Sequence, residues 1–264
     1  MTATGRSGSP RPVGFIFACA VAFCLSVIAT IHFCRSMCCE VPMPGGWTMS
    51  MMWLRMPAHT WAASAAGFLS MWLAMMVAMM LPSALPMFLN SRRPVAPDKS
   101  TASAGAMSLV ASGYFAVWLA AGAVVYGLGV VFAAVAMRSE SFSRAAPFLS
   151  GAALVIAGGL QFTRWKTSAL LRCRVAPGCA AVCPARGSSF LYGCKQGAAC
   201  CVCCAGLLIM QLALGAMNPF VMAGIAAIVA AEKLLPRPDR TARVVGLAAI
   251  LLGIGVMARI VRVT

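Results

Sequence analysis

Seven apolar runs divide this chain, and each is close to the length that crosses a lipid bilayer. They cover residues 13–33, 61–81, 107–136, 146–162, 197–216, 220–235 and 244–261. A helix rises about 1.5 Å per residue, so about 20 apolar residues span a hydrocarbon core of about 30 Å. The sequence therefore predicts an all-α fold, a polytopic transmembrane helix bundle with six to seven spans.

Composition excludes several functions that the length alone would permit. Hydrophobic residues make up 61% of the chain and charged residues only 10%, against roughly 25% charged in a soluble domain. With five acidic residues, catalysis by paired carboxylates is nearly excluded, and no hydrolytic triad, phosphate-binding glycine loop or nucleotide fold is recognisable. The 21 basic residues fall in short segments between apolar runs, which indicates membrane topology and the lipid bilayer as partner, and no nucleic acid.

Charge also predicts an orientation. With the amino terminus inside, 15 of the 21 basic residues lie on the cytoplasmic side, as the positive-inside rule requires. We expect a cytoplasmic tail at 1–12 and a single transmembrane helical domain at 13–264, in the inner membrane of a bacterium. A Met- and Cys-rich loop at 34–60 is then outside and a basic, Cys-bearing loop at 163–196 inside. The first run is expected to be a retained span, with a cleaved signal peptide as the alternative.

Methionines recur with helical spacing in the second run. At about 100° per residue, Met71, Met75 and Met79 share one stripe, and Met76 and Met80 form a second stripe beside it. Thioether sulfur is a soft, neutral ligand that suits Cu(I). These five residues are candidate metal ligands, and the alternative is that methionine serves here as a flexible packing residue.

The loop before that run continues the same enrichment, because residues 37–87 hold 12 of the 19 methionines. A solvent-facing loop has no packing reason for so many thioethers, so we expect it to capture metal. The candidate capture residues are Met37, Cys38, Cys39, Met49, Met51, Met52, Met56 and His59. An amphipathic segment anchored by tryptophans at headgroup level is a compatible alternative.

Four of the 13 cysteines lie within five residues at the start of the fifth run. On a helix, Cys200, Cys203 and Cys204 can converge on one face while Cys201 points elsewhere. Two or three thiolates suit Cu(I), and a tetrahedral set completed by Cys173 or Cys194 would suit zinc, the alternative metal.

Two further pairs of residues are candidates by position. Met217 and Asn218 lie where Pro219 breaks the apolar hairpin, so backbone carbonyl groups there lose their helical partners and need others, such as a metal ion. A tight turn is the alternative explanation for these two residues. Glu232 and Lys233 end the sixth run, where they are either a functional ion pair or ordinary interfacial residues.

Three separated motifs together resemble the family of predicted metal-binding integral membrane proteins, also classed as a domain of unknown function. They are MWLAMMVAMMLPSALP at 71–86, GGLQFTRWK at 158–166 with RCR at 172–174, and CCVCC, GAMNPFVM and EK between 200 and 233. The resemblance implies a helical membrane bundle that handles copper and supplies copper oxidases. The resemblance implies metal-binding roles for Met75, Met76, Met79, Met80, Cys173, Cys200, Cys203, Cys204, Met217 and Asn218. It also marks Gln161, Lys166, Glu232 and Lys233 as motif residues of unknown role. The chain departs from the family pattern at Ala169, usually Cys, and at Ala205, commonly Trp.

These features together predict a membrane Cu(I) chaperone or delivery factor for a copper enzyme, without catalytic residues of its own. Outer thioethers would capture the ion, the methionine stripes would carry it, and the cysteines would hold it more tightly. One alternative is a membrane thiol-disulfide oxidoreductase that uses Cys38 and Cys39 outside and the cysteines of 200–204 within the membrane. The other is a structural or assembly subunit in which methionine and cysteine only pack.

Overall fold

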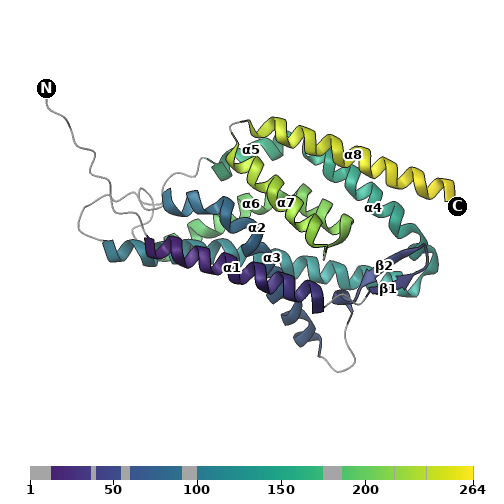
Figure 1. The fold of residues 1–264 in the computed structure, drawn as a ribbon, viewed down its shortest axis with the longest axis horizontal. Helices are drawn as coiled ribbons and strands as arrows, with labels where there is room; N and C mark the ends of the chain where they lie inside the picture. The colour runs from purple at the N-terminus through teal and green to yellow at the C-terminus, as the bar shows by residue number, and fades with distance from the viewer. Residues whose placement is uncertain are drawn as a thin grey trace.

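A computed structural model describes residues 13–36, 40–54, 60–90, 100–174, 186–216, 218–235 and 237–263. Within these residues the chain forms eight α-helices, one β-hairpin and one short 3-10 helix (Figure 1). The helices are α1 Val13–Ser36, α2 Trp61–Asn90, α3 Ser100–Arg138, α4 Glu140–Leu160, α5 Arg164–Arg174, α6 Arg186–Gly215, α7 Pro219–Leu234 and α8 Pro238–Val263. The all-α prediction is confirmed.

Six of the helices in the described residues are long and apolar enough to cross a membrane, namely α1, α2, α3, α4, α6 and α8. Helix α7 has 16 residues and is shorter than these, although it covers most of the run predicted at 220–235. Large apolar side chains on the long helices face outward, among them Leu25, Val124, Leu128 and Leu251. An apolar exterior of this kind is typical of helices in lipid.

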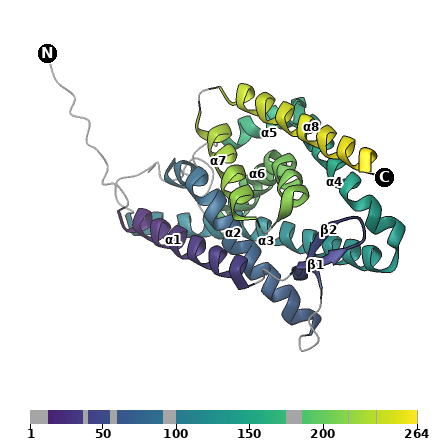
Figure 2. The same ribbon diagram turned by 45° about the vertical axis from the view of Figure 1, so that its right-hand side comes forward.

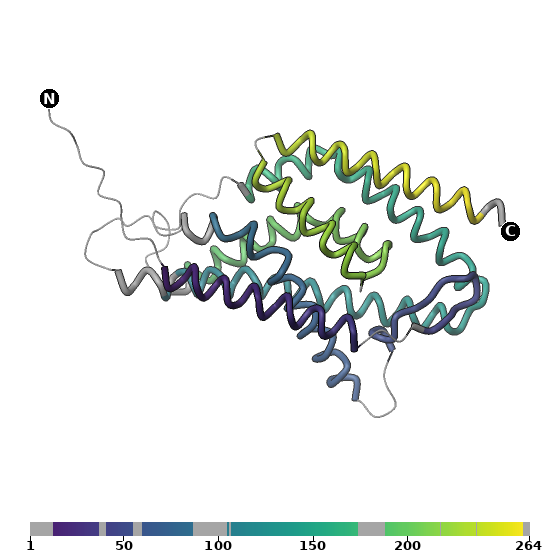
Figure 3. Tube along the Cα trace, viewed as in Figure 1, coloured from purple at the N-terminus to yellow at the C-terminus, as the bar shows by residue number. Residues whose placement is uncertain are grey.

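The helices are arranged around α6 and α7. Figures 1 and 2 show α4 and α8 side by side on one flank and α1, α2 and α3 on the other, with α6 and α7 between them. Figure 3 follows the chain from α6 through a tight return into α7. Gly215 ends α6 with φ +114°, a conformation that glycine adopts without a steric penalty. Both central helices have other helices on two sides, and α6 carries the cysteine motif into the middle of the bundle.

Glycines let α3 approach α6 closely. A Cβ atom on Gly197 would lie 2.7 Å from the Tyr114 carbonyl oxygen, and one on Gly113 or Gly193 would overlap backbone atoms of the opposite helix. Small residues permit such close backbone packing between membrane helices. Gly151 and Gly158 perform the same role between α4 and α8, so these two helices pack closely along one flank of the bundle.

The segment predicted as a loop at 34–60 has regular structure in its described part. Strand β1 Glu40–Met43 pairs antiparallel with β2 Trp47–Ser50, and the 3-10 helix η1 Met51–Trp53 follows. Gly45 and Gly46 form the turn with φ +103° and +73°, a region that favours glycine. A Gly-Gly pair between short β-compatible stretches signals a hairpin, and the loop prediction overlooked it.

Two other boundaries differ from the sequence prediction. Helix α2 continues through Pro82 and Pro86 to Asn90, although proline normally kinks or ends a helix. The segment 163–196, predicted as a loop, is helical at both ends, with α5 at its start and the first turns of α6 at its end. These two helical ends place cysteine and lysine side chains against the bundle. A loop would have left those side chains outside it.

Candidate metal centre

Three cysteine side chains of α6 lie on its buried face. Cys200, Cys203 and Cys204 are each 2% exposed or less, while Cys201 is half-buried. The Sγ atoms of Cys200 and Cys204 are 4.0 Å apart, one helical turn along the same face. Two thiolates that share one metal ion at about 2.3 Å are separated by roughly 4 Å. The spacing therefore suits a shared soft ion after small side-chain adjustments.

A fourth thiol joins this group from α5. The Cys173 side chain hydrogen-bonds to Cys200 and to Cys203, and these bonds together with burial raise the pKa of Cys173. Thr163 begins the helix that presents it, because its Oγ1 accepts a hydrogen bond from the Lys166 backbone N–H at 3.3 Å. We call Cys173, Cys200, Cys203 and Cys204 the cysteine cluster.

Ala169, which departs from the family pattern, lies beside this cluster. It is buried with Leu170 and Cys203 in one small packing group, against which Cys173 also packs. A cysteine at this position would therefore add a thiol next to Cys203. In this chain the cluster has an alanine methyl group there instead.

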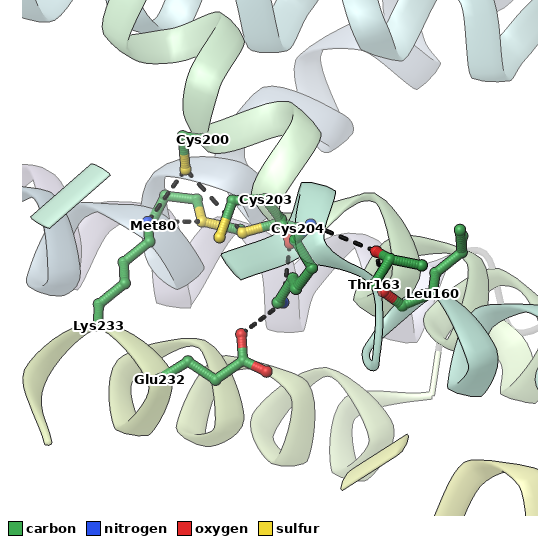
Figure 4. Close-up of polar contacts among 9 residues, drawn as sticks. Met80, Leu160, Thr163, Cys200, Cys203, Cys204, Glu232 and Lys233 are labelled. Atoms are coloured by element: carbon green, nitrogen blue, oxygen red, sulfur yellow. Dashed lines mark hydrogen bonds and ion pairs between the residues drawn. The ribbon is translucent and has the colours of Figure 1, made fainter. Parts of the chain in front are cut away.

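Polar groups from two other helices contact Cys200. The Lys233 ammonium of α7 donates to Cys200 Sγ at 3.0 Å and to Ser83 Oγ at 3.2 Å. The Tyr114 hydroxyl of α3 donates to the same sulfur at 3.0 Å. Met80 Sδ lies 3.9 Å from the ammonium, and Figure 4 shows Lys233 reaching between Met80 and Cys200. A positive charge thus stands beside the sulfur atoms.

A buried ion pair lies on the other side of the cluster. Lys166 Nζ donates to Glu232 Oε2 at 2.7 Å and to the Cys203 carbonyl oxygen at 2.8 Å (Figure 4). Both side chains are nearly inaccessible, at 6% and 1% exposure. Glu232 therefore pairs with Lys166 and not with Lys233 as predicted, because successive helical residues point in different directions. Glu232 contacts Lys166, and Lys233 contacts Cys200, so the two neighbouring residues serve different parts of the site.

The five methionines predicted on α2 all lie in the protein interior. Met71, Met75, Met76, Met79 and Met80 are each 4% exposed or less and share the main core with Cys200 and Cys204. The second stripe ends beside the cluster, where Met80 approaches Lys233. Both stripes therefore face other helices of the bundle.

Several predicted residues are described but stand apart from the cluster. Asn218 is exposed and begins α7, accepting hydrogen bonds from the Phe220 and Val221 N–H groups, so the tight-turn interpretation fits it. Among the described residues, both polar atoms of the buried Gln161 side chain lack a hydrogen-bond partner. Met49 and Met52 are buried and Met51 is half-buried. The other predicted positions lie outside the described residues: Met37, Cys38, Cys39, Met56, His59 and Met217.

Sequence reasoning missed three polar residues that the fold brings to the cysteine cluster, to Lys233 and to the methionine stripes. Tyr114 and Ser83 lie at Cys200 and Lys233, and Gln211 Nε2 donates to Met75 Sδ at 3.1 Å. A polar residue inside an apolar span is costly unless it has a partner or a function. Tyr114 and Gln211 both lie inside predicted apolar runs, so their polarity could have marked them as candidates from the sequence.

The donor chemistry fits a soft metal ion as cargo. Thiols and a thioether gather in a buried site, and such ligands select Cu(I) over hard cations. Within the described part of the chain, no three His, Cys, Asp or Glu side chains already form a closed coordination sphere. Copper binding would therefore require the cysteine side chains to rotate toward a common centre.

Comparison with known proteins identifies a family. A family model described as PpoB2, copper chaperone, matches residues 69–256, a range that contains α3 to α7 and all residues of the cysteine cluster. No curated protein matches the chain. No solved structure matches it either.

Proposed function

Because the chain belongs to the PpoB2 copper-chaperone family, we propose that it is a membrane-embedded chaperone that holds Cu(I) at the cysteine cluster. The observation that carries the proposal is the burial of Cys200, Cys203 and Cys204 beside Met80 and Lys233. Thioether and thiolate ligands are the set that favours the cuprous ion.

Charge balance supports a monovalent ion at this site. Cu(I) with two or more thiolates carries a net negative charge, which is costly in a buried site without a counter-charge. The Lys233 ammonium at 3.0 Å from Cys200 Sγ supplies that charge. A tetrahedral zinc shell would use all four thiols of the cluster, and four thiolates around Zn²⁺ carry more negative charge than the single Lys233 ammonium balances.

We propose that residues 13–264 form a single transmembrane domain in a bacterial inner membrane and that residues 1–12 lie in the cytoplasm. In this orientation the hairpin and η1 are outside, and α5 with the start of α6 is inside. Six helices of sufficient length and the excess of basic residues predicted on the inner side support it. Helix α7 makes the return from the outer end of α6 to the start of α8.

The proposed activity is delivery of Cu(I) to a copper enzyme such as a copper oxidase. Neutral thioethers bind the ion weakly, so it can exchange between neighbouring methionines, and thiolates then hold it more tightly. No step needs a change of oxidation state. The two alternatives from the sequence, an oxidoreductase and a structural subunit, receive no support from the family match.

Copper retention by purified, reduced protein tests the proposal, with two neighbouring cysteines as a matched pair. Cys204→Ser removes a buried thiol of the cluster, and Cys201→Ser removes the half-buried thiol outside it. We expect wild type and Cys201→Ser to retain copper after desalting, and Cys204→Ser to lose most of it. Equal retention by all three proteins would contradict the proposed site.

Delivery is tested separately in cells that lack the gene. Copper oxidase activity should fall in the deletion strain and return with the wild-type gene or with Cys201→Ser, but not with Cys204→Ser. Membrane fractionation of the same cells locates the protein. Restoration of oxidase activity by Cys204→Ser at equal protein level would contradict a role of the cluster in delivery.

A further inference from the structure

A second group of sulfur-bearing side chains surrounds a small cavity, away from the cysteine cluster. Its walls include Met52 from η1, Met71 and Met75 from α2, and Gln211 from α6. The volume is about 10 Å³, close to the minimum of roughly 10–15 Å³ that holds one water molecule. The space therefore suits a single small ion.

One wall residue has a hydrogen-bonding atom without a partner. Gln211 is 1% exposed, and its Nε2 donates to Met75 Sδ at 3.1 Å, whereas its Oε1 has no hydrogen-bond partner among the described residues. A buried carbonyl oxygen left unpaired is destabilising. A cation in the cavity would give this oxygen a partner, which is independent evidence for a ligand here.

The hairpin that carries Met52 is fixed to the rest of the protein. Trp47 Nε1 donates to the Ser143 carbonyl oxygen at 2.8 Å, and Ser143 Oγ donates to the Pro44 carbonyl oxygen at 3.0 Å. These bonds hold the hairpin against the start of α4 and place η1 beside α2 and α3. Met52, 8% exposed, is thereby buried rather than left in solvent.

Aromatic rings complete the enclosure. Trp53, Phe68 and Trp72 also line the cavity, and Trp72 is fixed by a 2.9 Å hydrogen bond to the Trp118 carbonyl oxygen. Glycines of α3 leave room for the indoles, because a Cβ atom on Gly122 or Gly129 would collide with Trp72 or Trp53. Aromatic faces attract cations, and more strongly when water is excluded.

We propose that Met52, Met71, Met75 and Gln211 form an outer Cu(I) site that receives the ion before it reaches the cysteine cluster. This rests on the proposed function. The thioethers are soft but neutral, so the outer site binds more weakly than the cluster and exchanges its ion readily. The Gln211 amide oxygen completes the donor set, while its amide nitrogen positions Met75.

The two sites are connected along α2. Met71 and Met80 are nine residues apart, which is about 13 Å along a helix. Met76 and Met79, both buried, lie between them in the same core. An ion that leaves the outer site thus meets further thioethers before it reaches Cys200.

Silver(I), a redox-inert analogue of Cu(I), tests this assignment on the full-length reduced protein in detergent. Retained silver and tryptophan fluorescence are measured together, because Trp53 and Trp72 line only the outer cavity. We expect wild type to bind a tight and a weaker class of silver, and the weaker class to quench fluorescence. Met71→Leu/Met75→Leu should lose the weaker class and the quenching while keeping the tight class. Met222→Leu, a buried methionine outside the cavity, should behave as wild type.

A second variant keeps the assignment falsifiable if the double variant misfolds. Gln211→Leu should weaken the outer class by about tenfold or more and leave the tight class unchanged. An unchanged weaker class in both variants would overturn the outer site. Loss of both classes in a Gln211→Leu protein of normal thermal stability would also overturn it, since the two sites would not be separate. Absence of any silver binding by wild type would instead overturn the proposed function and the outer site with it.

Discussion

The ammonium of Lys233 lies 3.0 Å from the sulfur of Cys200, and the two residues come from facing helices α7 and α6. Lys233 also donates to Ser83, so its position is fixed from two sides. A lysine held against a thiol inside a helix bundle has a clear electrostatic consequence. It favours the anionic form that a metal ligand must adopt.

Replacement of Lys233 by methionine should weaken Cu(I) binding. The buried thiolate complex then lacks its counter-charge, and we expect a loss of about tenfold in affinity, or about 1.4 kcal/mol. Competition with a chromophoric Cu(I) chelator measures this. Lys195→Met, which removes the same charge from an exposed side chain of α6, is the control. An affinity equal to that of wild type would show that the ammonium does not stabilise the complex.

The Lys166–Glu232 ion pair should contribute to stability through its burial. Removal of one partner leaves an uncompensated buried charge, which costs about 3–5 kcal/mol, so Lys166→Met should lower the unfolding temperature markedly. The double variant Lys166→Met/Glu232→Leu should recover most of the loss. Thermal unfolding in detergent measures all of these proteins.

An exposed ion pair provides the matched control for that experiment. Arg144 and Glu140 are 69% and 64% exposed, so Arg144→Ala should cost about 1 kcal/mol or less. A similar loss for Lys166→Met and Arg144→Ala would mean that the buried pair has no special role in stability.

Close packing of α3 and α6 should be needed for copper binding. Gly193→Ala places a methyl group against the Val110 backbone, which pushes apart the helices that carry Tyr114 and Cys200. We expect lower thermal stability and weaker Cu(I) binding together. Gly127→Ala, also in a helix but with open space around the new Cβ atom, should retain both properties. If Gly193→Ala behaved like Gly127→Ala, the close contact would not position the site.

Cys173 should contribute to the cluster although α5 is a separate helix. Because Cys173 contacts Cys200 and Cys203, we expect Cys173→Ala to weaken Cu(I) retention by about tenfold. An effect of this size is typical when a metal site loses a ligand or a residue that orients a ligand. Cys194→Ala is the control, since that thiol is also half-buried. Equal retention by the two variants would remove Cys173 from the site.

The sequence predicted those parts of the site that depend on local periodicity. The methionine stripes of α2 and the shared face of Cys200, Cys203 and Cys204 follow from 3.6 residues per turn, whatever the helices pack against. The long apolar runs likewise predicted an all-helical bundle, and the structure confirms that class.

Contacts between distant segments were beyond such reasoning. The partner of Glu232 is Lys166, 66 residues away, and sequence proximity suggested Lys233 instead. Gln211 meets Met75 across 136 residues because α2 and α6 share a core, which no local pattern reveals. The hairpin that buries Met52 depends on Ser143 of a later helix, so its position could not be derived from the loop composition.

X-ray absorption at the copper edge, on reduced protein loaded with one equivalent of Cu(I), tests the central claim most directly. The account predicts a first shell of sulfur only, retained in Cys201→Ser and replaced or lost in Cys200→Ser/Cys203→Ser/Cys204→Ser. Nitrogen or oxygen ligands in wild type, or a sulfur shell unchanged in the triple variant, would contradict the assignment of the cysteine cluster as the copper-binding site.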